Sequence, residues 1–482
     1  MHPLRILRFT GILIFFLGLS MCFPIAVSHY YGDGGAKALW VSLLCTCVTG
    51  VILFTAARSD RQTHLSHRDG VAIVTFGWVA AGLAGSLPFL LSGTIPGFTD
   101  ACFESVSGFT TTGASVLADI EKAPRGLLLW RSLIQWLGGM GIIVLSIAIL
   151  PFLGVGGMQL YKAEIPSPVV DKLKPRISDT AKTLWKVYIL ITILQILFLL
   201  AGRMSLFDAV CHTFCTMPTG GFSPRNASIA HYQDAYIDGV IIVFMLVAGM
   251  NFSLHYRLIK GDWRTFYRDP EMRVFLGIVA VVTALVTFEL HGNVYDSLGK
   301  AFRYALFQVS SIITTTGFVT ADFDQWPSLS KTLLVLCMFL GGMAGSTGGG
   351  LKTMRVVLLA RQAYQEMFRI IHPHAVTAVK LGGKAVPPEV MSSIWGFTLL
   401  YLGLFAVSTL LVAAVGLDLV SAVSAVATCI CNVGPGLGSV GPVQNYIAVP
   451  LLGKWVLIFC MLAGRLEIYT VIVLLAPEFW RK

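Results

Sequence analysis

Long apolar runs separated by short polar segments make up most of the chain. Ten of them are close to the roughly 20 residues that a helix needs to cross a bilayer. They cover residues 9–27, 37–56, 71–92, 126–150, 184–202, 237–256, 274–290, 332–350, 392–416 and 451–475. The first run follows Arg5 and Arg8 as a signal peptide would, but it is long for one and lacks a small-residue cleavage site. The pattern therefore predicts ten spanning helices, with the first one retained.

Four further apolar stretches are too short to cross. They occupy residues 100–113, 207–221, 301–317 and 418–434, and each ends in a turn centred on a glycine. The four glycines follow one another at intervals of 108, 96 and 117 residues; they are Gly113, Gly221, Gly317 and Gly434. This spacing indicates an internal repeat of span, half-helix, glycine turn and span, present four times.

The repeat predicts an all-α membrane protein with four pseudo-symmetric helix–pore-loop–helix repeats around one pore, behind an N-terminal two-helix hairpin. The expected units are the hairpin at residues 1–69 and pore repeats at 70–158, 159–260, 261–360 and 361–482.

The distribution of basic residues predicts the orientation. With a cytoplasmic N-terminus, the segments on the inner side hold 24 of the 35 Lys and Arg residues. Because cytoplasmic loops of membrane proteins are enriched in Lys and Arg, both termini are expected in the cytoplasm and the glycine turns on the outer side.

Glycine turns at membrane depth indicate an ion pathway. Non-helical backbone is tolerated there only where it lines water or is buried in protein, since an unpaired carbonyl in lipid costs several kcal/mol. Four turns around one axis can direct their carbonyl oxygens inward and replace the hydration shell of an ion. Glycine permits the backbone conformations that this requires and leaves the passage open.

The sign of the ion's charge also follows from this arrangement. Half-helices that enter from outside point their partly negative C-terminal ends toward the membrane centre, which favours a cation. No ring of acidic residues accompanies the turns, so a monovalent cation is expected rather than a divalent one. Asp100, Glu104 and Asp208 lie near the starts of half-helices, where they either stabilise the helix N-terminus or attract cations.

Composition excludes an ordinary soluble protein. Of 482 residues, 55% are hydrophobic and only 12% are charged, about half the charged share of a soluble domain. The net charge of +10 comes from residues in short loops, so no nucleic-acid partner is expected. Cys211 and Cys215 flank His212, but they lack the second half of a zinc site. No converging set of catalytic side chains supports an enzyme.

Five motifs carry a family resemblance. They lie at residues 104–113, 136–142, 341–352, 432–438 and 464–467. At these residues the sequence resembles the Trk/Ktr/HKT superfamily of potassium transporters, and it is most similar to bacterial potassium uptake proteins of the TrkH/TrkG kind. The resemblance extends over essentially the whole chain.

The resemblance implies a selectivity filter in which backbone carbonyls hold potassium. In the second repeat Gly221 is preferred to Gly220, because Gly221-Phe222 parallels Gly317-Phe318; Pro218 makes this repeat depart most from the family pattern. The implied filter residues are Thr111, Thr112, Gly113, Gly220, Gly221, Thr315, Thr316, Gly317, Asn432, Val433 and Gly434.

The resemblance also implies an intramembrane gate. A run as rich in glycine as 341–350 is costly to hold as a helix, since each Gly loses roughly 1 kcal/mol against Ala; the alternative is a close-packed helix crossing. Arg465 lies inside the last apolar run and is expected to face the pore beneath the filter, or else to be paired for structure only. The implied gate residues are Gly345, Ser346, Thr347, Gly348, Gly349, Gly350, Lys352 and Arg465.

The family assembles as a homodimer in the bacterial inner membrane, on which a cytosolic Rossmann-like regulatory ring of the TrkA kind docks. We therefore expect potassium uptake through a gated pore, no covalent cofactor, and a nucleotide bound by the partner. A proton- or sodium-coupled carrier and a sodium-permeable pore remain alternatives. The basic inner segments 162–186, 257–273 and 352–384 are expected to bind this ring or anionic lipid headgroups, or only to set the topology.

Overall fold

The computed structural model describes residues 3–57, 66–148, 177–375, 377–382 and 384–481. In this part the chain is predominantly helical, which confirms the predicted fold class. The described sheet is a two-residue antiparallel pairing of β1 (Lys380–Leu381) with β2 (Lys384–Ala385).

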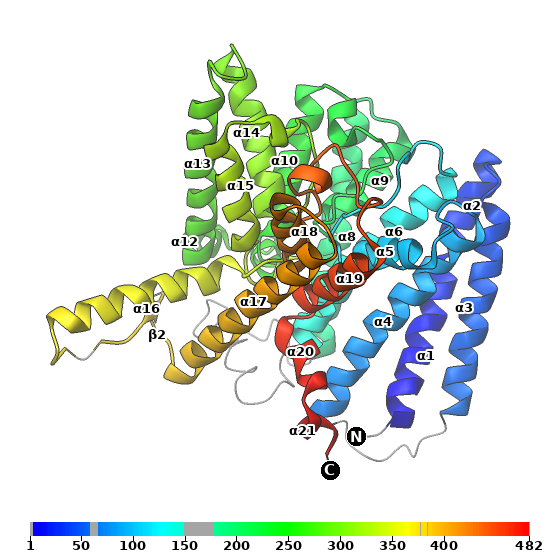
Figure 1. Ribbon diagram of the computed structural model, residues 1–482, viewed down its shortest axis with the longest axis horizontal. Helices are drawn as coiled ribbons and strands as arrows, with labels where there is room; N and C mark the ends of the chain where they lie inside the picture. The colour runs from blue at the N-terminus through cyan, green and yellow to red at the C-terminus, as the bar shows by residue number, and fades with distance from the viewer. Residues whose placement is uncertain (1–2, 58–65, 149–176, 376, 383, 482) are drawn as a thin grey trace.

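The N-terminal hairpin stands beside the body of the molecule (Figure 1). It consists of α1 (Pro3–Ser20) and α2 (Cys22–Tyr31), which together are long enough to cross a membrane, and of α3 (Ala36–Ala56). Its contacts with the body run through α4 (His67–Leu91) and α6 (Arg125–Ala148), the outer and inner helices of the first repeat.

Four short helices occupy the predicted half-helix positions. Each has 11 to 16 residues, so at about 1.5 Å per residue it is roughly 16–24 Å long. That is short of the roughly 30 Å of a bilayer core. They are α5 (Phe98–Phe109), α9 (Leu206–Thr216), α14 (Leu298–Ile313) and α18 (Leu419–Cys431).

Side chains define where two of these half-helices begin. The Ser205 hydroxyl accepts a hydrogen bond from the Asp208 amide at the start of α9, and the Asp418 carboxylate accepts one from Ser421 at the start of α18. Such caps satisfy amides that have no partner within the helix. The C-terminal halves of the half-helices are buried in the protein, where their unpaired carbonyl ends avoid lipid.

Longer helices flank the half-helices. The outer helices of repeats two to four are α8 (Ile177–Ala201), α13 (Pro270–Leu290) and α17 (Pro388–Ala414). The inner helices are α10 (Ala235–Gly249) with α11 (Phe252–Ile259), α15 (Ser328–Leu340), and α19 (Leu451–Arg465) with α20 (Ile468–Ile472). Two short helices, α12 (Trp263–Arg268) and α21 (Pro477–Trp480), follow α11 and α20 along the chain.

The prediction of unbroken spans at 237–256 and 451–475 was wrong. Among the described residues, six helices are long and apolar enough to cross a membrane, and two bent pairs raise the number to eight. The pair α10–α11 bends by 104° and the pair α19–α20 by 119°. The run 332–350 is helical only to Leu340, as its glycine-rich second half predicted. The described part of run 126–150 lies in α6. A hydropathy profile does not reveal the breaks within α10–α11 and α19–α20, because the polar groups that contact the chain at these breaks come from distant segments.

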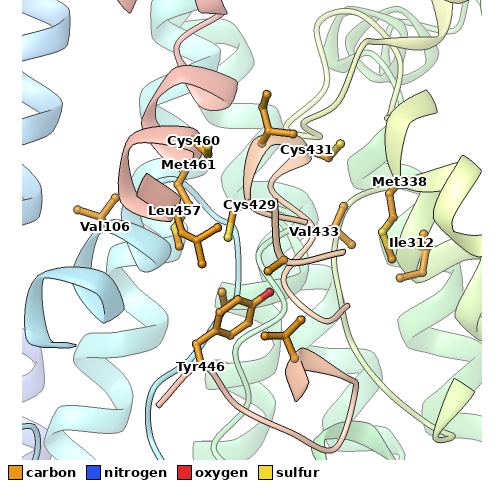
Figure 2. Packing of buried hydrophobic residues seen from close by; sticks show 14 of the residues in the cluster. Val106, Ile312, Met338, Cys429, Cys431, Val433, Tyr446, Leu457, Cys460 and Met461 are labelled. Atoms are coloured by element: carbon orange, nitrogen blue, oxygen red, sulfur yellow. The ribbon is translucent and has the colours of Figure 1, made fainter. Parts of the chain in front are cut away.

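Buried side chains join the repeats into one core. Figure 2 shows Cys429 and Val433 of the fourth repeat between Met461 of α19 on one side and Ile312 of the third repeat on the other. All four side chains are fully buried. In contrast, α16 (Thr353–Ile371) runs out from the body as an arm, and the β1–β2 hairpin lies along the return path to α17 (Figure 1).

Candidate functional site

The four predicted filter glycines lie around one closed ring. In each repeat, a β-carbon added to this glycine would collide with a backbone carbonyl oxygen of the next repeat. The distances are 2.2 Å from Gly113 to the Gly220 oxygen, 2.0 Å from Gly221 to Thr316, 2.0 Å from Gly317 to Val433, and 2.6 Å from Gly434 to Thr112. Because the fourth contact returns to the first repeat, the four turns surround a common axis.

The four turns share one backbone conformation. The glycine has a φ between 74° and 97°, and the residue two places before it has a φ between 53° and 60°. Residues with side chains seldom adopt such angles. The earlier positions are Thr111, Thr219, Thr315 and Asn432. This conformation places Gly221, and not Gly220, in the register of the other three glycines.

Each half-helix holds its turn by one backbone hydrogen bond of the same kind. The residue before the glycine donates its amide proton to a carbonyl near the end of the half-helix. The distances are 2.9 Å from Thr112 to Ser107, and 2.8 Å from Gly220 to Cys215, from Thr316 to Ser311 and from Val433 to Thr428. The turn therefore continues directly from the C-terminal end of the helix, where the helix dipole is negative.

A polar side chain on each half-helix also holds the segment that follows the glycine. Its chemistry differs from one repeat to the next. Glu104 accepts hydrogen bonds from Ser115 and Val116, His212 shares one with Ser223, Gln308 donates to Thr320, and Ser424 bonds the backbone of Leu437. The turn is thus supported on both sides in all four repeats.

Carboxylates near the half-helices are paired with basic side chains. Asp100 lies 2.6 Å from Lys454, and Asp208 lies 2.7 Å from Arg225. Glu104 is fully buried and lies 2.5 Å from Arg131 of α6. Asp100 and Asp208 lie in the first turns of their half-helices, as one interpretation expected, whereas Glu104 lies in the middle of α5. Because all three are paired with basic side chains, the interpretation as a cation-attracting mouth is not favoured.

The glycine-rich segment lies directly beneath the filter turns. We call residues 341–352 the gate loop, after the role that the family resemblance implies for them. The Thr347 hydroxyl donates to the Met217 carbonyl at 3.0 Å, and the Gly349 amide donates to the Thr315 hydroxyl at 2.8 Å. A β-carbon on Gly349 would lie 2.2 Å from the Cys431 oxygen. The loop therefore contacts the inner ends of the second, third and fourth turns.

The gate loop is irregular, since α15 ends at Leu340 and α16 begins at Thr353. Gly341, Gly345, Gly350 and Lys352 have φ between 63° and 76°, which rules out the alternative of a regular helix crossing here. The Lys352 ammonium donates to the Gly348 carbonyl, which closes the end of the loop.

Contacts with three other helices, α10, α11 and α13, hold the gate loop. The Met343 amide donates to the carbonyl of Gly249, and the amide of Phe252 donates to that of Gly345, so the loop fills the break between α10 and α11. The Glu271 carboxylate accepts from Ala344 at 2.8 Å and from Met354 at 3.2 Å.

Arg465 lies against the gate loop, at the last position of α19. It is 3% exposed, and its Nη1 donates to the Thr347 carbonyl at 2.6 Å. Its Nε and Nη2 atoms have no hydrogen-bond partner among the described residues. The nearby Glu467 has a φ of 58° and pairs instead with Arg355 at 2.7 Å. The arrangement leaves a buried positive charge beside the loop, below the filter.

Sequence reasoning missed the residues that connect these parts. The break at Met250–Asn251 has a signal, because the Asn251 side chain caps α11 by accepting from the Ser253 amide. Glu467, a charged residue within an apolar run, marks the second break, although its side chain does not cap α20. In the part of the chain that the structure describes, no cluster of three metal-ligating side chains occurs.

Comparison with known proteins matches the whole arrangement. A family model described as TrkH, cation transport protein, matches residues 37–482. The Trk system potassium uptake protein TrkH of Salmonella typhimurium is 42% identical, and that of Halomonas elongata is 44% identical; each alignment covers at least 99% of both chains. The crystal structure of the potassium transporter TrkH from Vibrio parahaemolyticus superposes with a TM-score of 0.92 at 40% identity over 100% of both chains. The chain belongs to the TrkH family of cation transport proteins.

Proposed function

We propose that this protein takes up potassium across the bacterial inner membrane through a gated, cation-selective pore. The observation that carries the proposal is the closed ring of four glycine turns, each at the negative end of a half-helix. The relatives named above are potassium uptake proteins or a potassium transporter. Carbonyl oxygens of the turns, with no carboxylate ring, suit a monovalent cation that sheds its water on entering.

The gate loop and Arg465 are the proposed closure. The loop crosses beneath three of the four turns, so an ion leaving the filter inward meets its backbone. The guanidinium of Arg465 holds the loop through Thr347 and adds an electrostatic barrier to a cation. Opening then requires the loop to leave the pore axis.

A coupled carrier is the second candidate, and the two bent helix pairs favour it. Broken helices at membrane depth are typical of secondary transporters, which bind an ion near the midplane. A carrier moves potassium only together with a proton or sodium ion, whereas a pore follows the potassium gradient alone. A sodium-permeable pore is the third possibility within the same architecture.

The regulatory partner is proposed to bind the inner face. With both termini cytoplasmic, the arm α16 and the helix α12 lie on that side, and they present basic residues such as Arg264 and Arg361. Much of segment 162–186 lies outside the described residues. A homodimer with one pore per protomer, a nucleotide bound by the cytosolic ring, and lipid headgroups at the basic loops complete the proposal.

Purified protein in liposomes tests the function. Potassium or rubidium should enter down its gradient, and sodium much more slowly. If uptake requires a proton or sodium gradient, the carrier is right; if none of the three cations moves, the proposed function is wrong.

A further inference from the structure

The second filter turn is held by a helix of the first repeat. On α6, the residues Arg131, Gln135 and Gly139 follow one another at intervals of four, so they lie along one face of the helix. All three contact the second turn. Gly139 lies where a β-carbon would be 2.4 Å from Pro218, and Arg131 donates to the Ser223 carbonyl at 3.0 Å.

Gln135 makes the central contact. Its Nε2 donates to the Gly220 carbonyl at 2.6 Å, and its Oε1 accepts from the Phe222 amide at 3.2 Å. One amide group therefore binds the backbone on both sides of the filter glycine Gly221. Gln135 is fully buried, so these hydrogen bonds have no competition from water.

This contact distinguishes the second turn from the other three. The carbonyl of Gly220 corresponds to those of Thr112, Thr316 and Val433 in the ring. Among these four carbonyls, within the described residues, only that of Gly220 accepts a side-chain hydrogen bond. The lone pairs of the Gly220 carbonyl oxygen are shared between Gln135 and the ring. The electrostatic field of the four ring carbonyls is therefore asymmetric.

The contact also explains why the second repeat departs from the pattern. The φ of Gly220 lies outside the left-handed region, so its backbone tolerates a side chain. The equivalent positions in the other repeats carry Thr112, Thr316 and Val433. A β-carbon on Gly220 would lie 2.5 Å from the Gln135 amide. Glycine at this position is therefore required by Gln135 and not by the turn itself. Pro218, the other departure, packs on the same helix face.

We infer that Gln135 is a positioning residue for the filter and that it determines the preference among monovalent cations. This inference rests on the proposed function, since it assumes that the four turns form the ion-selective site. Gln135 affects the cation preference indirectly, by fixing the peptide groups of Gly220 and Phe222. Arg131 stabilises the same turn farther out, through its hydrogen bond to Ser223 and by stacking on the Phe222 ring at 3.5 Å.

Gln135→Met tests the inference, because it keeps the volume and removes both hydrogen bonds. The permeability ratio of potassium to sodium should fall about fivefold or more, since the loss of one such hydrogen bond already corresponds to about that factor. The matched control is Gln195→Met, since Gln195 is equally buried and donates at 2.8 Å to the Thr216 side chain at the end of the same half-helix, rather than to the backbone of the turn. The control should keep the wild-type ratio.

A double-mutant cycle covers the case in which Gln135→Met folds poorly. Gly220→Ala should displace the Gln135 amide and lower the potassium-to-sodium permeability ratio by a similar factor. The double variant Gly220→Ala with Gln135→Ala should have a ratio no lower than that of either single variant. Additive losses in the cycle, or an unchanged ratio in folded Gln135→Met, would overturn the inference. Wild-type protein that moves no potassium would instead contradict the proposed function.

Discussion

Gly434 and Thr112 belong to the last and the first pore repeats, yet a β-carbon on Gly434 would lie 2.6 Å from the Thr112 carbonyl oxygen. This contact joins the fourth repeat to the first and closes the ring of turns. The Asn432 side chain strengthens the junction by donating to the Thr112 hydroxyl at 3.0 Å. A single chain thus builds the four-fold ring of turns that the proposed potassium pore requires.

Replacing a ring glycine should weaken selectivity. In Gly317→Ser, the new β-carbon meets the Val433 oxygen at 2.0 Å in a residue whose φ is 80°. The turn must shift, so the preference for potassium over sodium should fall by about tenfold or more, corresponding to roughly 1.4 kcal/mol. Cation flux into liposomes measures the ratio. Gly277→Ser on α13 is the control, because nothing lies within 4 Å of its position; equal ratios in both variants would count against Gly317.

Removing the gate loop should raise flux. Deletion of Gly345–Gly350 eliminates the backbone that lies beneath the second, third and fourth turns. The passage below the filter then opens, and rubidium uptake by liposomes should increase. A well-folded deletion variant with wild-type or lower uptake would show that the loop does not close the pore.

Neutralising Arg465 should also raise cation flux. Arg465→Gln removes a positive charge from the path of a cation and weakens the bond that holds Thr347. An increase of about tenfold in uptake corresponds to a barrier lower by roughly 1.4 kcal/mol. Arg361→Gln on the exposed arm is the control for loss of a charge. Slower uptake in folded Arg465→Gln protein would identify Arg465 as a purely structural residue.

The buried pair of Glu104 and Arg131 should support stability. Glu104→Ala leaves Arg131 buried without its carboxylate, at a cost of about 3–5 kcal/mol for breaking such a pair. The melting temperature in detergent should fall clearly. Glu366→Ala is a suitable comparison, because Glu366 pairs with Arg369 on the exposed arm, where an ion pair contributes about 0–1 kcal/mol. Similar melting temperatures for the two variants would contradict this role of Glu104.

Reversing charge on the arm α16 should show whether its basic residues bind the cytosolic ring or only set the membrane topology. Arg361→Glu and Arg369→Glu should reduce binding of the cytosolic ring, since both side chains lie on α16. Lys300→Glu, an exposed position in the first turn of the half-helix α14, serves as the control. If ring binding is unchanged while the protein still inserts correctly, these residues set only the topology.

The repeat was predictable from sequence because half-helices and glycine turns recur along the chain itself. Gly221 could be chosen from its neighbour Phe222, and the structure gives it the same left-handed conformation as Gly113. The breaks at Asn251 and Glu467 were not predicted, since the groups that fill them, the gate loop and Arg355, come from distant segments. Gln135 gave no signal for the same reason, because its importance lies in a contact with Gly220, 85 residues away.

The central claim is that the four turns cradle one dehydrated monovalent cation on a shared axis. Crystals grown in rubidium test it most directly through anomalous diffraction. The account predicts rubidium peaks on the axis among Gly113, Gly221, Gly317 and Gly434, with carbonyl oxygens from all four repeats around them. Ordered rubidium elsewhere in the protein, and none among these four residues, would contradict it.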